Sequence, residues 1–200
     1  MTAVDGAPPV GARTRILDAA LALMSEQGSA GASMRRLASA CDLNVATIYH
    51  YFPSKADLLR SVLAERRYGE RLSSDAPPLD PTVPPRPRLV ALVEWLWANA
   101  LEEEAVWRLL VGEGIRGEEA ATAGTAAVVD ALASALTTWL DEGFPELTLD
   151  RAALARVVRG QVFALVVEHL ALAPVTAADA RQRAEELAAL VIPDGHQSVG

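Results

Sequence analysis

The chain has 200 residues, of which 51% are hydrophobic and 22% are charged, and its formal net charge is −8 at pH 7. This length suits one or two domains with an apolar core, and abundant alanine and leucine with few aromatic residues favour helices over sheets. A single cysteine excludes an intramolecular disulfide framework. No apolar run approaches the roughly 20 residues that cross a bilayer, and no signal peptide is visible. We therefore expect a cytoplasmic protein without a membrane partner.

The charge is unevenly divided along the chain. Residues 1–72 hold nine Lys or Arg and seven Asp or Glu, a net charge of +2, whereas residues 73–200 hold nine and nineteen, a net charge of −10. The division favours a mildly basic module that faces DNA, attached to an acidic body that DNA repels. An excess of two positive charges is small, and solvated helix faces produce such imbalances by chance.

The N-terminal third begins with a tail and two predicted helices. Residues 1–10 contain glycine and proline with little apolar pattern and are predicted to be a disordered tail. From Arg13 onward, apolar residues recur at helical spacing and predict a helix that ends near Gly28. Ser33 is the expected N-cap of the second helix.

A second pair of helices follows a tight turn at residues 41–43. Asn44 is the expected N-cap of a short helix, which stops before Pro53. Ser54 then caps a longer helix that runs to about Leu72 and places Lys55 in its first turn.

A stretch rich in proline separates this region from the rest of the chain. Residues 73–87 hold six prolines, and because proline lacks an amide donor, we expect no helix to persist there. The stretch is either a domain boundary or an extended loop. Further helices are predicted at about 88–103, 105–113, 117–142, 150–173 and 177–191, and nothing indicates a strand.

The short helix after Asn44 carries a polar and aromatic face that burial does not explain. A helix, a turn of about four residues and an exposed second helix form a helix-turn-helix, whose second helix enters the major groove of DNA. Thr47 can bond a phosphate or a base edge, and the hydroxyl groups of Tyr49 and Tyr51 suit phosphates. Lys55 lies at a helix start, where a phosphate is favoured.

Four sequence segments extend this interpretation to a family. They read ILDAA at 16–20, EQG at 26–28, SMRRLA at 33–38 and ATIYHYFPSKADLL at 46–59. With them, the region from Arg13 to about Leu63 resembles the DNA-binding domain of the tetracycline-repressor (TetR) family of bacterial regulators. The resemblance covers about a quarter of the chain, and the remainder matches only in length and helical style.

The resemblance implies a homodimer that places two helix-turn-helix heads on a palindromic, double-stranded DNA operator. It also implies a C-terminal domain in which a small-molecule effector changes the spacing of the heads. Carried over by position, the DNA contacts are expected to be Arg35, Val45, Ala46, Thr47, Tyr49, His50, Tyr51 and Lys55. For the dimer interface, it nominates the helices at 150–173 and 177–191.

The sequence departs from the family pattern at three places. Asp42 stands in the turn where the family usually has glycine, so we expect modest strain from a left-handed backbone. Asn44 replaces the commoner serine cap, which is a nearly neutral exchange. Val45 and Ala46 are apolar where many relatives carry polar residues that read bases, so the operator sequence stays open.

The C-terminal body offers candidates for an effector pocket, namely Trp95, Trp107, Gln161, Glu168 and His169. Gln161 and Glu168 lie seven residues apart on one face of an otherwise apolar helix, and buried polar groups need partners. Three kinds of partner stay open for these two residues: a ligand, a second copy of the chain, or neighbouring side chains.

We therefore predict an all-α fold of about nine helices, with no cofactor, no metal and no catalytic residue. Its expected divisions are a tail at 1–10, a three-helix helix-turn-helix DNA-binding domain at 11–60, a helical regulatory and dimerisation domain at 61–193 with the proline-rich loop at 73–87, and a tail at 194–200. The predicted function is a ligand-responsive transcriptional regulator, more specifically a repressor. An activator or an adaptor that has lost DNA binding is the alternative, whereas no nucleophile motif, phosphate loop or metal spacing supports an enzyme.

Overall fold

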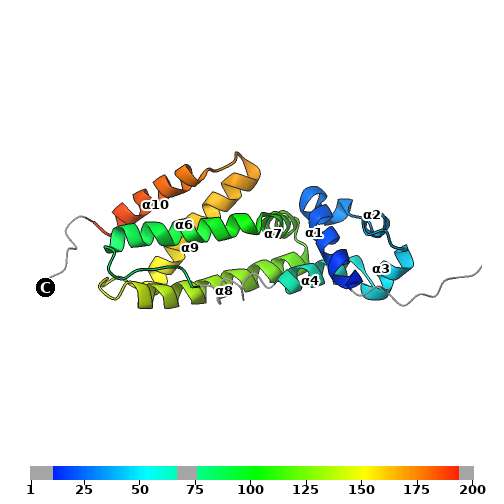
Figure 1. The fold of residues 1–200 in the computed structure, drawn as a ribbon, viewed down its shortest axis with the longest axis horizontal. Helices are drawn as coiled ribbons and strands as arrows, with labels where there is room; N and C mark the ends of the chain where they lie inside the picture. Colours follow the sequence, from blue (N-terminus) through cyan, green and yellow to red (C-terminus); the bar gives the residue numbers. More distant parts are fainter. Residues whose placement is uncertain (1–10, 67–75, 194–200) are drawn as a thin grey trace, which may run out of the picture. The chain divides into compact units, whose positions relative to one another are not determined.

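A computed structural model describes residues 11–66 and 76–193 of the chain (Figure 1). Within these ranges there are nine helices and no strand, which confirms the all-α prediction. The predicted tails at 1–10 and 194–200, and the start of the proline-rich stretch, lie outside the described residues. The described chain divides into two compact units, one formed by residues 11–66 with 105–126 and the other by residues 76–104 with 127–193.

The first unit contains four N-terminal helices and segments of two later ones. They are α1 (Ala12–Gly31), α2 (Met34–Ala40), α3 (Val45–Tyr51), α4 (Lys55–Arg66), most of α7 (Glu104–Ile115) and the start of α8 (Glu119–Gly143). Helix α1 packs against both α2 and α4, and α2 packs against α3. The side chains buried at the centre of this packing are Ile16, Leu17, Ala20, Met24, Leu37, Ile48, Leu58 and Leu59.

The predicted N-caps of α2 and α3 are present in the structure. The Ser33 hydroxyl accepts a hydrogen bond from the amide of Arg36, and the Asn44 side chain accepts one from the amide of Ala46, as predicted. Helix α1 is interrupted at Gly28, where it was predicted to end, because this residue has φ 73° and ψ 163°. A last helical turn follows the interruption and reaches residue 31.

The second unit is built from α6 (Pro85–Glu102), the remainder of α8, α9 (Arg151–Ala171) and α10 (Ala177–Val191). Helix α6 packs against both α9 and α10, and α10 runs alongside it (Figure 1). The fully buried side chains at its centre include Leu89, Leu92, Val93, Leu136, Leu140, Val158 and Leu165.

The start of α6 corrects the expectation that no helix persists through residue 87. The helix begins at Pro85, three residues before the predicted start, with Pro84 as its N-cap. Proline is tolerated in the first turn, because the amides of that turn have no carbonyl partner inside the helix and the fixed φ already suits the helix. The described residues before it, 76–84, contain no helix.

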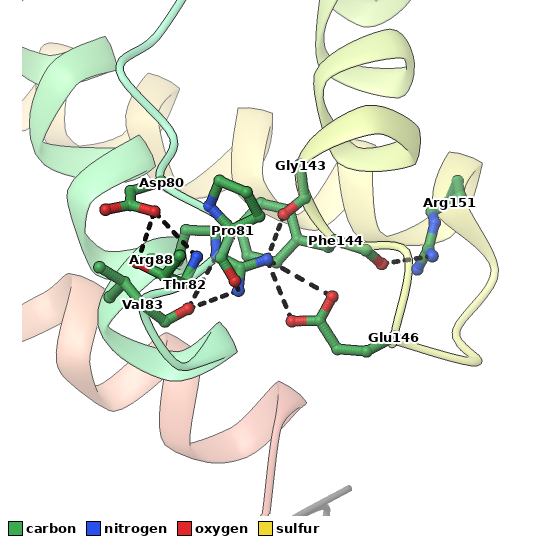
Figure 2. Close-up of polar contacts among 9 residues, drawn as sticks. All are labelled: Asp80, Pro81, Thr82, Val83, Arg88, Gly143, Phe144, Glu146 and Arg151. Atoms are coloured by element: carbon green, nitrogen blue, oxygen red, sulfur yellow. Dashed lines mark hydrogen bonds and ion pairs between the residues drawn. The ribbon is translucent and has the colours of Figure 1, made fainter. Parts of the chain in front are cut away.

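A buried arginine joins the proline-rich loop to the end of α8. Arg88 has only 3% of its surface exposed, and Figure 2 shows its guanidinium group surrounded by acceptors. These acceptors are the carbonyl oxygens of Pro81, Val83 and Gly143 and the carboxylate of Glu146. A buried guanidinium group needs this number of partners, so the cluster fixes the loop to the body of the second unit.

Helix α8 corrects the expectation that no segment is long and apolar enough to cross a membrane. Its residues 121–143 meet that test by length and composition. The helix is nevertheless a core element, because its buried side chains recur at helical spacing along one face, at Val128, Leu132, Ala135, Leu136, Trp139 and Leu140. One such helix is weak evidence for a membrane span.

Candidate nucleic-acid interface

The turn between α2 and α3 is short and is closed by backbone hydrogen bonds. The amide of Leu43 donates to the carbonyl of Ala38 at 2.9 Å, and the amide of Asp42 donates to Ser39 at 3.2 Å. Asp42 has φ 51°, the left-handed conformation expected for this position. It is the one non-glycine residue with positive φ in the described part of the chain. Because this conformation brings Cβ close to the following carbonyl oxygen, aspartate there destabilises the fold by about 1 kcal/mol.

Helix α3 has one fully buried side chain, and three of its other six residues are exposed. Ile48 is its buried residue, while Ala46 and His50 are exposed and Tyr49 keeps 49% of its surface accessible. A seven-residue helix gains little stability alone, so α3 depends on Ile48 and on its packing against α2. The arrangement presents a fixed but largely open helix surface.

All eight residues predicted to contact DNA lie in the first unit, on α2, α3 and the first turn of α4. The exposed members are Arg35, Ala46, Tyr49 and His50, and the half-buried members are Val45, Thr47, Tyr51 and Lys55. The structure brings the His50 and Tyr51 rings together edge to face, with their centroids 5.6 Å apart. The exposed members give the surface both donors and an aromatic face, which are the groups that bind phosphates and base edges.

Lys55 has a structural partner in addition to its predicted role. Its ammonium group donates to the carbonyl oxygen of Ala30, in the last turn of α1, at 3.3 Å. A cation at a helix C-terminus stabilises carbonyl groups that lack helical partners. Lys55 therefore ties α4 to the end of α1, and its remaining donors can face a phosphate.

Two arginines of α1 support the motif and were missed by sequence reasoning. The guanidinium of Arg15 donates to the carbonyl of Cys41 in the turn at 3.2 Å. The guanidinium carbon of Arg13 lies 5.4 Å from the centre of the Phe52 ring, which is a cation–π distance. The sequence gives no sign of these contacts, because each arginine lies more than 25 positions from its partner.

The start of α4 is fixed by a cluster of three side chains. The amide of Asp57 donates to the Ser54 hydroxyl at 3.0 Å, and this hydroxyl donates to the Asp57 carboxylate at 2.7 Å. The carboxylate also pairs with Arg60 at 2.8 Å. The hydrogen bond from Ser54, followed by that from Arg60, lowers the pKa of Asp57 below its ordinary value. The predicted cap at Ser54 is therefore confirmed.

Cys41 is a free, buried thiol. Burial raises its pKa above the ordinary value, and the charge of Arg15 opposes that effect only in part. A thiol with a raised pKa holds little of the reactive thiolate at neutral pH, so Cys41 acts as a small apolar side chain in the turn.

The five residues nominated for an effector pocket do not form one group. Trp107 is buried in the first unit, whereas the other four belong to the second. Trp95 packs edge to face against Trp139, with their centroids 5.4 Å apart. His169 accepts a hydrogen bond from the amide of Val175 through Nδ1, and Gln161 is half-buried on α9.

Glu168 has its partner within the chain. The Arg183 guanidinium donates to both carboxylate oxygens, at 2.5 and 2.8 Å, and the hydrogen bond lowers the pKa of Glu168. Of the three kinds of partner left open for this residue, the structure supplies a neighbouring side chain. No arrangement of three or more His, Cys, Asp or Glu side chains suited to a metal ion occurs among residues 11–66 and 76–193.

Comparison with known proteins supports the interpretation of the N-terminal region. Residues 16–62 match the family model described as "Bacterial regulatory proteins, tetR family". The HTH-type transcriptional repressor KstR of Rhodococcus jostii is 52% identical over 62 residues, which are 31% of this chain and 28% of that protein. An HTH-type transcriptional regulator from the dhlA 5′ region of Xanthobacter autotrophicus is 34% identical over 97 residues, 48% of each chain. The matches therefore span about a quarter to a half of these relatives.

Solved structures match over nearly the whole chain. A TetR transcription regulator from Haloarcula marismortui has a TM-score of 0.74 at 20% identity, covering 92% of this chain and 99% of that one. A transcriptional regulator from Aquifex aeolicus has a TM-score of 0.72 at 18% identity, covering 90% and 99%. At this identity the likeness concerns the fold. The curated relatives named here are regulators of transcription by name.

Proposed function

We propose that this chain, which belongs to the tetR family of bacterial regulatory proteins through residues 16–62, is a ligand-responsive transcriptional repressor. It binds a palindromic DNA operator as a homodimer in the cytoplasm and is released by a small molecule. The observation that carries the proposal is the open surface of α3, a short helix anchored by Ile48 with its aromatic and polar side chains exposed. The name of KstR as a repressor favours repression over activation.

A gel-shift experiment with the DNA upstream of the protein's own gene tests this function. We expect binding that is specific for that DNA and weakens steeply with salt, because lysine and arginine contacts to phosphates release counterions. Binding equal to that of unrelated DNA of the same length would favour the alternative, an adaptor that keeps the fold without reading DNA.

The interface residues are proposed to divide into two roles. Thr47, Tyr49, Tyr51 and Lys55 hold the DNA backbone, whereas Arg35 and Val45 meet base edges, with Ala46 and His50 beside them. Lys55→Met should weaken binding to all sequences alike and reduce the salt slope by about one, while Arg35→Ala should change the preference among sequences. Competition binding on a panel of operator variants measures both effects.

Two control variants sharpen this test. Tyr49→Phe removes only the hydroxyl group, so it separates a phosphate contact from ring packing. Arg181→Ala removes a positive charge from the exposed surface of the second unit and should leave DNA binding unchanged. If Arg35→Ala and Lys55→Met had the same effect on every sequence, the division of roles would be wrong.

The homodimer is proposed to form through α9. This helix leaves Val157 and Phe163 exposed, the latter with 43% of its surface accessible, and a Cβ added at Gly160 between them would meet no atom of the described residues within 4 Å. Helix α10, the other helix nominated for the interface, buries Ala180, Ala184, Leu187 and Ala188 within its own unit, where it packs on α6. Its outer side carries charged pairs such as Arg181 with Glu185, so it is a poorer interface.

Placing a charge on this surface of α9 should dissociate the dimer. Phe163→Arg is expected to sediment as a monomer at concentrations where the unaltered protein is a dimer, because an unpaired charge would be buried at the interface. Leu190→Arg, on α10, is the matched control and should remain dimeric. A monomeric Leu190→Arg with a dimeric Phe163→Arg would move the interface to α10.

The effector is proposed to bind in the second unit, where Trp95, Gln161 and His169 stay candidates for its contacts. Large apolar rings with a few polar groups suit a small apolar or aromatic molecule. Glu168 is paired with Arg183 and Trp107 lies in the first unit, so both are weaker candidates.

A further inference from the structure

The buried carboxylate of Glu113, on α7, is hydrogen-bonded to the last turn of α1. Glu113 has only 2% of its surface exposed and was not singled out by any sequence pattern. Its carboxylate accepts hydrogen bonds from the Ser29 amide at 2.8 Å and from the Ser29 hydroxyl at 2.5 Å. The guanidinium of Arg116, which lies in the turn just after α7, donates to the same carboxylate at 2.6 Å. The carboxylate thus connects residues 84 positions apart in sequence within the first unit.

The interruption of α1 at Gly28 makes the hydrogen bond between Ser29 and Glu113 possible. At Gly28 the backbone adopts φ 73° and ψ 163°, a region that is essentially restricted to glycine. The turn releases the amide of Ser29 from the helical ladder, so the amide can donate to Glu113 instead. A side chain at residue 28 would also lie 2.7 Å from Arg116 Nη2 and 3.2 Å from Glu113 Oε1. The glycine therefore provides both the conformation and the close approach.

The carboxylate is held in its charged form. Burial by itself would raise the pKa of Glu113, but the hydrogen bonds from Arg116 and Ser29 outweigh that effect, and the pKa lies below its ordinary value. Charge-assisted hydrogen bonds to a buried carboxylate are shorter and stronger than neutral ones. Glu113 is therefore a buried, charged acceptor, although its partner Arg116 keeps 55% of its side chain exposed.

The segment that Glu113 holds, residues 28–32, is followed directly by the N-cap of α2. Ser33, the N-cap of α2, follows Ser29 by four residues. Ala30, the residue after Ser29, accepts the hydrogen bond from Lys55 at the start of α4. The segment 28–32 thus contacts α7 on one side and leads to or contacts the start of α2 and of α4 on the other.

From this arrangement we propose that Glu113 is a positioning residue for DNA recognition. Through Ser29 it fixes segment 28–32, and through that segment it sets the direction of α2 and α3 relative to α7. In a dimer, a change in this direction would change the distance between the two α3 helices. The inference rests on the proposed function, since it concerns how a dimeric regulator fits two half-sites.

The test compares Ser29→Ala and Glu113→Gln with Ser25→Ala. Ser25 lies on the same helix, and its exposed hydroxyl donates to the carbonyl of Ala22 one turn back, so it is a matched control. Once the operator has been located on the upstream DNA, binding is measured to the full palindrome, to a single half-site, and to palindromes lengthened by one or two base pairs between the half-sites.

We expect Ser29→Ala and Glu113→Gln to lose about tenfold in affinity for the full palindrome and to keep their affinity for the half-site. They should also discriminate less than the unaltered protein against lengthened palindromes. Equal losses on half-site and palindrome would show damage to the head itself, and together with unchanged spacing preference would overturn the proposal. Behaviour identical to that of Ser25→Ala would overturn it as well.

Amide hydrogen exchange tests the role of Glu113 independently of whether the protein binds DNA. In the full-length protein without DNA, the amides of residues 28–32 should exchange more slowly than in Glu113→Gln, with the largest difference at Ser29. If the unaltered protein does not bind the upstream DNA, the proposed function fails, and a faster exchange in Glu113→Gln would still show the connection. If exchange at Ser29 is the same in both proteins, the positioning role of Glu113 is wrong whatever the DNA result.

Discussion

Arg88→Met is expected to destabilise the second unit by about 3 kcal/mol, because the change removes a buried guanidinium group and leaves the three backbone carbonyl groups that accept from it without that donor. Arg88 Nε donates to the carbonyl of Val83 at 3.0 Å, and Nη2 donates to Pro81 at 2.9 Å. On the other side, Nη1 donates to the carbonyl of Gly143 and lies 3.0 Å from a carboxylate oxygen of Glu146. Methionine fills a similar volume but offers no donor.

The surroundings of Arg88 explain why lysine would be a poor replacement. The guanidinium carbon lies 5.2 Å from the centre of the Phe144 ring. The planar guanidinium group donates to acceptors of the loop and of the end of α8 at the same time (Figure 2). Lysine keeps the charge but presents a single ammonium group, so Arg88→Lys should recover only part of the stability.

Denaturant unfolding measures the effect, with Arg181→Ala as the control. Arg181 is exposed and pairs with Glu94 and Glu185, and surface pairs of this kind contribute at most about 1 kcal/mol. A loss for Arg88→Met no greater than that for Arg181→Ala would mean that the loop before α6 is not held by this cluster.

Ile48→Ala is expected to abolish specific DNA binding and to destabilise the first unit by about 2–5 kcal/mol. Ile48 is the one fully buried side chain of α3. Removing three carbon atoms there leaves a cavity beneath a helix of only seven residues, which cannot persist alone. The exposed residues of α3 would then lose their fixed arrangement although none of them has changed.

Ile48→Val is the matched control, since it removes one carbon atom and should cost about 0.5–1.5 kcal/mol while keeping DNA binding. Circular dichroism during thermal unfolding and gel shifts measure the two effects. Specific binding by Ile48→Ala at the unaltered level would show that the orientation of α3 does not depend on this anchor.

Local chemistry explains what could be predicted from the sequence. The caps at Ser33, Asn44 and Ser54 depend on residues within four positions of one another, so the sequence alone predicts them. The left-handed backbone at Asp42 was expected from the family resemblance. The start of α6 was misjudged because proline disrupts a helix interior but suits its first turn.

The remaining features arise from contacts between distant segments. Glu113 reads as an ordinary polar residue of α7, and only the fold brings Ser29 against it. Arg88 similarly reads as a solvated charge near a helix start, yet it is buried under the loop before its own helix. The sequence makes Glu168 a candidate for contact with a ligand, whereas the fold pairs it with Arg183. No periodicity encodes such pairings, because they depend on how helices pack.

Footprinting on the DNA upstream of the gene tests the central claim most directly. If α3 reads the major groove from two heads of a dimer, the protein should protect two inverted half-sites whose centres lie roughly one helical turn, about 34–36 Å, or a multiple of it apart. The protection should require the face of α3 that carries Tyr49 and should weaken with salt. Protection of no defined sequence, or of a single unpaired half-site at saturation, would contradict the account.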